Sequence, residues 1–526
     1  MNRKLKNWIT AVPAGVVAML SFAVCAGLGI ASLFVLANMQ VQDFATEISE
    51  KLTIGHRNLI AALLGPLLLT GVLLAAVRLL RKKINWKTAR WVTLAAALGS
   101  IALCFLWMYS FSAYPSADQD ITWSFAKELA LRTGMDDWQY DYLRIHPYQS
   151  GTAMVMEIFI RLFGENWYPW LALCAVSAGG VVTMLCCLCG RITDSPCAKC
   201  LCAVLLLSFF PLAMYSTFVY GTLPGICMAL FGLYAIVRMC SGTSHSPAWW
   251  AVSVLTFAAA IILYTGEQIF LAAAVIVLFV TGLMRPGQRR KMLAAVLLAV
   301  LAVGICKAWQ AVAMSRFGMP NDPGCPILPR ILMGVDAHSE NPAPGFYNGI
   351  CLSVFRECNY DAALANQVSV GHIRNSLVAL HEQGRFVKFF AEKTLDQWLE
   401  PWFSALSMAN PSIYNEPKWL AQALTTGGLF APLQAWLSLL LSFVYLGSAA
   451  GIAVVARRKR GEVWPLVLMV CLIGGFLFQL AYETKARYCM PYYLCCFPMA
   501  AAGVAALAEK LLKSKGQTEK SNQTER

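Results

Sequence analysis

The sequence predicts an all-α polytopic membrane protein with about twelve transmembrane helices, and three observations support this. The chain has 526 residues, 58% hydrophobic and only 13% charged, whereas soluble chains carry about 25% charged residues. Apolar runs of about 20 residues, long enough to cross a bilayer as a helix, recur from end to end. Unpaired backbone groups are costly in lipid, so such runs must be helical. This composition excludes a soluble enzyme, a disordered protein and a disulfide scaffold.

The predicted spans follow one another along the whole chain. In order, they lie near residues 12–37, 58–80, 91–112, 167–190, 200–219, 222–240, 248–265, 267–284, 292–313, 428–455, 463–482 and 489–508. The first span follows MNRKLKNW and resembles a signal peptide. Its apolar run is about 25 residues long without a clear small-residue cleavage site, so we expect a retained anchor.

The basic residues indicate the topology. With the N-terminus in the cytoplasm, the connections that contain most of the Lys and Arg, such as Arg457 to Arg460, also lie in the cytoplasm, as the positive-inside rule requires. An even number of helices then returns the C-terminus to the cytoplasm. The net charge of +14 is therefore mostly a topology signal. No basic stripe with interleaved aromatic residues indicates a nucleic-acid partner.

This topology divides the chain into four parts. They are an N-terminal bundle at 1–313 with an outer loop at 113–166, a large outer segment of mixed structure at 314–427, C-terminal helices at 428–509 and a cytoplasmic tail at 510–526. Segment 38–57 is also outside but short. Loops longer than about 12–15 residues are uncommon unless they are functional or folded, so we expect the chemistry in the two long outer segments. Within 368–402, apolar residues at helical spacing predict a helix on or near the membrane, preceded by a small mixed domain.

Most of the nineteen cysteines lie in or beside apolar spans, where a thiol behaves as a small hydrophobic side chain. Cys197 and Cys200 have the CxxC spacing of a zinc or redox site, but no second pair or nearby His completes it. Cys325, Cys351 and Cys358 lie in the large outer segment. Two of these three could form a disulfide, which would leave one thiol over.

Two carboxylates, Asp118 and Asp120, follow a Tyr-Pro turn just beyond the third predicted span. At the membrane surface, an Asp in a partly desolvated site could act as a general base toward a lipid-linked substrate. The alternative is that an Asp here caps the helix predicted for ITWSFAKELA. The Asp-Gln-Asp sequence could also hold a divalent cation through oxygen ligands, but nothing else marks a full coordination shell.

The second half of the first outer loop contains DYLRIHPYQSG at 141–151 and leads into an amphipathic stretch ending in RLFG. Here the sequence resembles the GT-C superfamily of membrane glycosyltransferases, specifically the bacterial relatives of protein O-mannosyltransferases and of lipid A aminoarabinose transferase. YSTFVYG at 215–221 and ETKARYCMPY at 483–492 extend the resemblance. The chain departs from many relatives in having three helices before this loop, and Asp-Gln-Asp where several have an Asp-Glu pair.

The resemblance implies inverting transfer of a sugar from a polyprenyl-phosphate donor to an envelope acceptor, a glycan, lipid or protein, on the outer face. It implies that Asp118 or Asp120 is the general base, with Asp118 preferred. Lys485 and Arg487 would stabilise the departing lipid phosphate; alternatively, these two cations only snorkel to the interface. No resident cofactor is implied.

Several other polar residues are weaker candidates. Arg144 and His146 could contact the phosphate or the sugar, and Tyr220 and Gln149 lie in the motifs that resemble the family. Glu267 and Lys307 are ionisable groups at membrane depth, where such groups are usually functional. Glu157 and Arg161, spaced i,i+4, predict an ion pair within one helix.

Two other classes of function remain open at this point. A transporter or flippase of a lipid-linked saccharide would share the hydrophobicity and the interfacial cations, but the chain has no internal repeat of the kind that many transporters show. The second of these classes is a non-catalytic assembly protein of the cell envelope.

Overall fold

The long apolar helices form one bundle, as predicted. The computed structural model describes residues 3–39, 52–80, 82–110, 115, 117–241, 247–339, 343–408, 419, 423 and 428–524. Within them, ten helices are long and apolar enough to cross a membrane. These spans consist of, or contain, α1 (Arg3–Phe34), α2 (Leu59–Leu80), α3 (Trp86–Ser110), α7 (Tyr168–Thr193), α10 (Thr222–Ser241), α12 (Gln268–Met284), α13 (Arg290–Arg316), α20 (Phe430–Arg458), α21 (Val467–Ala481), and α22 (Met490–Leu494) with the start of α23 (Phe497–Thr524). The all-α polytopic fold class is confirmed.

The other two predicted spans are also helical but differ from single straight helices of full membrane length, so ten or eleven of the about twelve predicted spans have the length and composition of a crossing. The run near 200–219 is a pair bent by 58°, made of α8 (Pro196–Leu207) with α9 (Pro211–Met214) and the 3₁₀ turn η1 (Tyr215–Thr217). Pro211 has no backbone N–H to continue α8, which explains the break. The run near 248–265 is α11 (Pro247–Leu263), which is 17 residues long.

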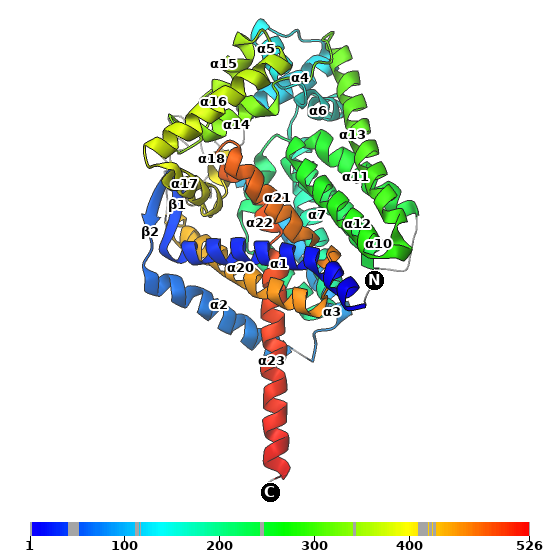
Figure 1. Ribbon diagram of the computed structural model, residues 1–526, viewed down its shortest axis with the longest axis vertical. Helices are drawn as coiled ribbons and strands as arrows, with labels where there is room; N and C mark the ends of the chain where they lie inside the picture. Colours follow the sequence, from blue (N-terminus) through cyan, green and yellow to red (C-terminus); the bar gives the residue numbers. More distant parts are fainter. Residues whose placement is uncertain are drawn as a thin grey trace.

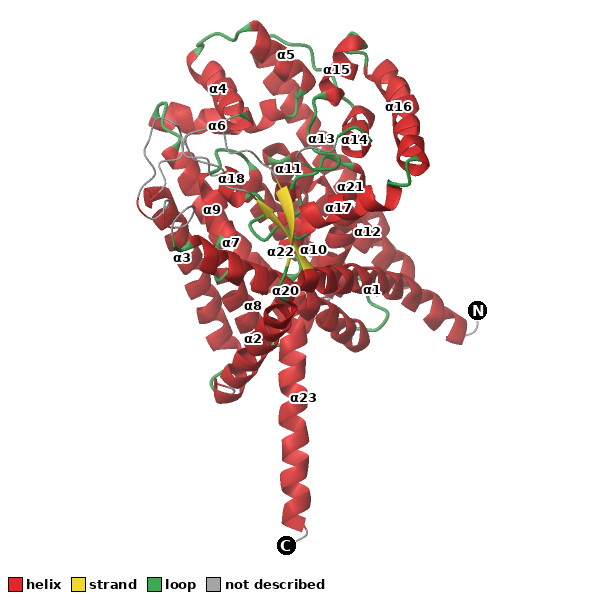
Figure 2. Cartoon of the chain, turned by 90° about the vertical axis from the view of Figure 1, so that its left-hand side faces the viewer, coloured by secondary structure: helices red, strands yellow, loops and turns green. Residues whose placement is uncertain are grey.

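A group of shorter helices covers one end of the bundle (Figures 1 and 2). We call this group the cap; it consists of α4 (Asp118–Leu131), α5 (Asp137–Ile145), α6 (Gln149–Phe163), α14 (Ile327–Val335), α15 (Ile350–Glu357) and α16 (Ala362–Glu382). Asp141 of α5 accepts hydrogen bonds from Arg356 Nη2 at 2.5 Å and from the Tyr360 hydroxyl. Cys325 N donates to Ile145 O at 3.0 Å. The two long outer segments of the sequence therefore pack together, and the site can draw on both.

The segment 368–402, predicted to be helical, forms two helices, the end of α16 and α17 (Phe386–Trp398). Gly384 ends α16 with φ +65°; its N–H donates to His381 O, and Arg385 N–H donates to Leu380 O, both at 2.9 Å. This is a Schellman motif, which closes a helix at a left-handed glycine. The short helix α18 (Ala405–Met408) follows.

The described residues of 314–427 form helices and loops, without a strand among them. The apolar residues of ILPRILMGV and ICLSVFRE recur at helical spacing, which explains the outcome. Strands occur instead beside the first helix, where β1 (Val35–Met39) pairs antiparallel with β2 (Leu52–His56). Residues 40–51, 409–418 and parts of 111–116 and 420–427 lie outside the described residues.

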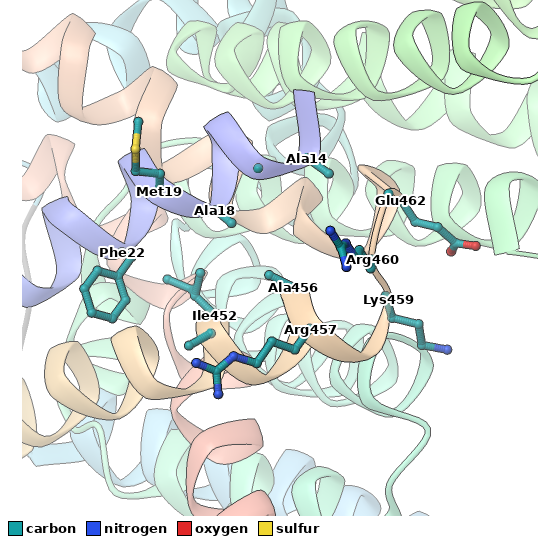
Figure 3. Close-up of a pocket in the computed structure, with 13 residues that line it drawn as sticks. Ala14, Ala18, Met19, Phe22, Ile452, Ala456, Arg457, Lys459, Arg460 and Glu462 are labelled. Carbon is teal, nitrogen blue, oxygen red and sulfur yellow. The ribbon is translucent and has the colours of Figure 1, made fainter. Parts of the chain in front are cut away.

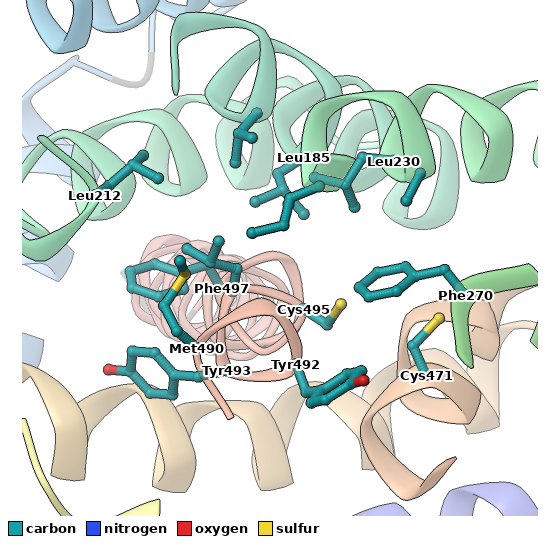
Figure 4. Close-up of a cluster of buried hydrophobic side chains, with 14 of the residues drawn as sticks. Leu185, Leu212, Leu230, Phe270, Cys471, Met490, Tyr492, Tyr493, Cys495 and Phe497 are labelled. Carbon is teal, nitrogen blue, oxygen red and sulfur yellow. The ribbon is translucent and has the colours of Figure 1, made fainter. Parts of the chain in front are cut away.

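The bundle core is apolar and tightly packed around the last two helices (Figure 4). Tyr493 stacks on Phe403 with ring centroids 4.7 Å apart. A Cβ added at Gly451 of α20 would lie 1.8 Å from the Met499 carbonyl oxygen of α23, so the two backbones are in direct contact there. All nineteen cysteines are free and most are buried, so the disulfide considered for the outer segment is not formed.

Candidate active site

A cavity of about 730 Å³ lies where the cap meets the bundle. Its wall combines cap residues such as Asp118, Tyr148 and Arg330 with membrane-helix residues such as Ile269 of α12 and Phe478 of α21. Tyrosines make up much of the remaining lining: Tyr215, Tyr220, Tyr264, Tyr482, Tyr488 and Tyr492. The cavity therefore spans the boundary between a polar cap and an apolar bundle, and aromatic rings line both parts.

Asp118 is the first residue of α4, so it does not cap the helix; Ala117 is the N-cap residue. Asp118 lines the cavity, whereas Asp120 does not and is exposed. Residues two apart on a helix point to different sides, so a helix that begins at Asp118 separates the two carboxylates. Of the two carboxylates, Asp118 is therefore the one that faces the cavity.

A chain of hydrogen bonds holds the Asp118 carboxylate. The Tyr142 hydroxyl donates to Asp118 Oδ1 at 2.8 Å and accepts from Gln149 Nε2 at 2.8 Å. Thr122 Oγ1 in turn donates to Gln149 Oε1 at 2.6 Å. Burial, together with the Asp118 charge, raises the pKa of Tyr142, which therefore stays protonated and remains a donor. Gln149, a lower-ranked candidate in the sequence, thus has a definite place in the site.

Arg487 approaches the second oxygen of this carboxylate, with its Nη2 4.0 Å from Asp118 Oδ2. It lines the cavity, and its guanidinium carbon lies 4.9 Å from the centre of the Tyr488 ring. Both residues belong to the turn η5 (Ala486–Tyr488) between α21 and α22. The predicted base and one predicted phosphate ligand, far apart in sequence, therefore meet in one cavity.

The chain before η5 is fastened to the outer segment. Buried Lys393 of α17 donates to the carbonyl oxygens of Gly334 and Tyr482. Thr484 N donates to Gly345 O at 2.8 Å, and Gln397 Nε2 donates to Glu483 O at 3.1 Å. Burial lowers the pKa of Lys393 to about 7, although the negative charge of Glu483 acts to raise this pKa. These contacts fix the backbone that presents Arg487 to the cavity.

Lys485 takes a different position from Arg487. It does not line the cavity; its Nζ lies 3.3 Å from Glu483 Oε1 and 5.0 Å from the centre of the Phe346 ring. Arg144 is exposed, with its guanidinium carbon 3.8 Å from the centre of the Tyr360 ring, and it does not line the cavity either. Neither side chain joins Asp118 in the cavity wall.

Arg330 of α14 is a cation of the cavity wall that the sequence analysis missed. Its Nη2 lies 3.1 Å from His146 Nδ1. Because arginine only donates, Nδ1 must accept, so His146 carries its proton on Nε2. Burial, with the charges of Arg330 and Arg356, lowers the pKa of His146 well below its ordinary value and keeps it neutral. His146 therefore orients Arg330; the one signal in the sequence was a single Arg within the apolar run ILPRILMGV.

The remaining candidates are spread around the cavity. Tyr220 lines it and stacks on Phe218, with ring centroids 5.3 Å apart. Lys307 and Glu267 also line it, Lys307 exposed and Glu267 buried. Glu157 lies outside it and forms the predicted pair with Arg161 at 2.7 Å; Arg316 joins at 2.5 Å, which links α6 to α13.

The divalent cation considered for Asp118 and Asp120 has no ligand set in the described part of the chain. Among these residues, no three His, Cys, Asp or Glu side chains come together as metal ligands would. The two Asp side chains point to different sides of α4, for the reason given above. Cys197 and Cys200 lie near the start of α8 as free thiols.

A second cavity, of about 580 Å³, lies between α1 and the end of α20 (Figure 3). Apolar residues of α1 and the basic residues Arg457, Lys459 and Arg460 line it. Two charged residues of its wall are already paired: Lys459 with Asp194 at 2.5 Å, and Glu462 with Arg285 at 2.7 Å. It has no carboxylate facing a free cation, so the cavity containing Asp118 is the better candidate for chemistry.

Comparisons with known proteins give a distant likeness of fold. No family model and no curated protein matches the chain. Among solved structures, it is similar to the archaeal oligosaccharyltransferase AglB from Archaeoglobus fulgidus in complex with an inhibitory peptide and a dolichol-phosphate (14% identity, TM-score 0.40, covering 82% of this chain and 51% of that one). The apo form of the Archaeoglobus fulgidus oligosaccharyltransferase gives 14% identity and a TM-score of 0.43, covering 82% and 52%.

The chain thus spans about half the length of the structures it matches. With identities of 14% and TM-scores below 0.5, this likeness carries no argument about function, and the case for a function rests on the site.

Proposed function

We propose that this protein is an integral-membrane glycosyltransferase that moves a sugar from a polyprenyl-phosphate donor to a hydroxyl group of an envelope acceptor, with inversion and with Asp118 as general base. One observation carries the proposal: a carboxylate and a guanidinium, Asp118 and Arg487, face each other in a cavity shared by the cap and the membrane helices. This arrangement suits a substrate with a charged phosphate and a lipid tail.

The chemistry follows from the two groups. Tyr142 occupies Asp118 Oδ1, so Oδ2, the oxygen nearer Arg487, is left to take the proton of the acceptor hydroxyl. The acceptor oxygen bonds to the anomeric carbon while the bond from that carbon to the phosphate oxygen breaks, and the lipid phosphate leaves with one more negative charge. Arg487 would move from Asp118 to the phosphate, and Arg330 supplies a second guanidinium in the same wall.

The cavity wall also supports a donor that is partly in lipid. Ile269, Ala272 and Phe478 continue the wall into α12 and α21, which are membrane helices. A polyprenyl chain could follow these apolar side chains while its phosphate reaches the arginines. The outer face of the membrane is then the face that the cap covers, with both termini in the cytoplasm.

The test uses the purified full-length protein in lipid nanodiscs with labelled undecaprenyl-phosphate sugars and envelope extracts as acceptors. Wild type should release lipid phosphate, and Asp118→Asn should abolish release. Asp120→Asn is the matched control, because Asp120 lies in the same helical turn but is exposed and outside the cavity wall. Equal release by wild type and Asp118→Asn would overturn the assignment.

The same experiment separates the other classes of function. A flippase would move labelled donor between leaflets without cleaving the sugar–phosphate bond, and an assembly protein would do neither. Orientation has its own test: a cysteine introduced at Asp137, in the cap, should react with an impermeant reagent from the outer side of the membrane.

A further inference from the structure

The cavity wall contains two buried polar residues that the proposed mechanism does not use. Glu267, in the turn η2 (Thr265–Glu267) before α12, and Gln479, near the end of α21, both belong to the wall. They are 1% and 3% exposed. In the described part of the chain, neither Glu267 carboxylate oxygen nor Gln479 Oε1 has a hydrogen-bond partner.

Such groups are unusual, because buried polar atoms in proteins are nearly always hydrogen-bonded. Leaving them unpaired destabilises the empty protein, and an apolar residue of similar size would not have that cost. Three unpaired acceptor atoms, from two residues of one cavity wall, are therefore best explained by a ligand that brings donors. The atoms require hydroxyl or N–H groups, and neither a phosphate nor a prenyl chain has them to offer.

We infer that Glu267 and Gln479 are specificity-determining residues that accept hydrogen bonds from hydroxyl groups of the donor saccharide. This inference rests on the proposed function. Tyr264 and Tyr492 also line the cavity, and the Tyr492 hydroxyl lies 3.4 Å from the carbonyl oxygen of Gly266, next to Glu267. The apolar faces of sugar rings pack well on such aromatic side chains. Tyr492 is held by stacking on Phe270, with ring centroids 5.7 Å apart. The cavity then has two functions: guanidinium groups bind the phosphate, and these acceptors recognise the sugar.

The test measures binding by the full-length protein in nanodiscs. The probes are undecaprenyl phosphate without sugar and the same lipid carrying glucose, mannose or N-acetylglucosamine. Wild type should bind at least one sugar-bearing lipid more tightly than the sugar-free lipid. Glu267→Gln and Gln479→Met should reduce that preference about tenfold or more, with sugar-free binding unchanged.

Thermal stability provides the second readout. Glu267→Met should raise the Tm of the empty protein, since it removes an unpaired buried carboxyl, although it weakens sugar recognition. Gln288→Leu is the matched control: Gln288 Oε1 is also buried without a described partner but lies outside the cavity. It should leave sugar preference unchanged.

The outcomes separate the two proposals. If the wild type releases lipid phosphate but Glu267→Gln keeps the full preference for sugar-bearing lipid, this inference is overturned and the proposed transferase activity is not. Wild type that binds sugar-bearing and sugar-free lipids equally also overturns it. Failure of wild type to bind any of these lipids overturns the transferase and this inference together. A lower Tm for Glu267→Met would show a structural role and overturn the specificity role.

Discussion

Replacing Tyr142 by Phe tests the positioning of the base without touching the carboxylate. The change removes the donor at 2.8 Å from Asp118 Oδ1. A hydrogen bond to a charged group contributes about 1.5–3 kcal/mol. If that stabilisation holds Asp118 in its reactive orientation, kcat should fall about 10- to 150-fold, since about 1.4 kcal/mol corresponds to a factor of ten. Gln149, 3% exposed, would also lose the acceptor of its Nε2, so the Tm should fall as well.

The assay is release of labelled lipid phosphate as a function of donor concentration. We expect the loss in kcat with little change in KM, because Tyr142 contacts the base and does not line the donor cavity. Tyr140→Phe is the matched control, since Tyr140 lies on the same helix α5 and is 42% exposed. A Tyr142→Phe enzyme with kcat within twofold of Tyr140→Phe would refute the reasoning.

Two further predictions concern stability. Burial lowers the pKa of Lys393 to about 7, so above pH 7 the unfolded chain holds a proton that the folded chain has lost, and stability rises with pH toward the ordinary lysine value. Between about pH 7.5 and 9.5, the stability of the wild type, measured by Tm or by chemical denaturation, should rise by up to about 1.4 kcal/mol per pH unit. Lys393→Met should abolish this rise. An unchanged slope in the variant would contradict the prediction. Gly451→Ala should destabilise by about 1–3 kcal/mol, because its Cβ would lie 1.8 Å from Met499 O. Gly15→Ala, with nothing within 4 Å, should not.

The bundle was largely readable from sequence because hydrophobic length is a strong and local signal. The described residues of the predicted runs are almost all helical, and one run is interrupted at Pro211; the outer segment 368–402 is interrupted at Gly384. Neither interruption alters the apolar pattern that predicts a helix, so periodicity alone could not place them.

The site was only partly predictable, because it depends on contacts between distant segments. Asp118 and Arg487 were named from a resemblance, and the start of α4 then separated Asp118 from Asp120. In the sequence, Arg330 is a single cation in an apolar helix, and only the structure places His146 beside it. Lys485 and Arg487, two residues apart in one motif, take different environments, which spacing could not reveal.

The fastening of the η5 turn to the outer segment has a consequence for how the protein is made. Asp118 is synthesised well before Arg487 and the helices around it. Lys393 can find its acceptor on Tyr482 only after α21 has been inserted. A truncated or stalled chain would therefore insert most of its helices and still lack one wall of the cavity. A chain released before residue 487 would leave Asp118 without Arg487, so the complete cavity wall forms only after synthesis has passed that residue.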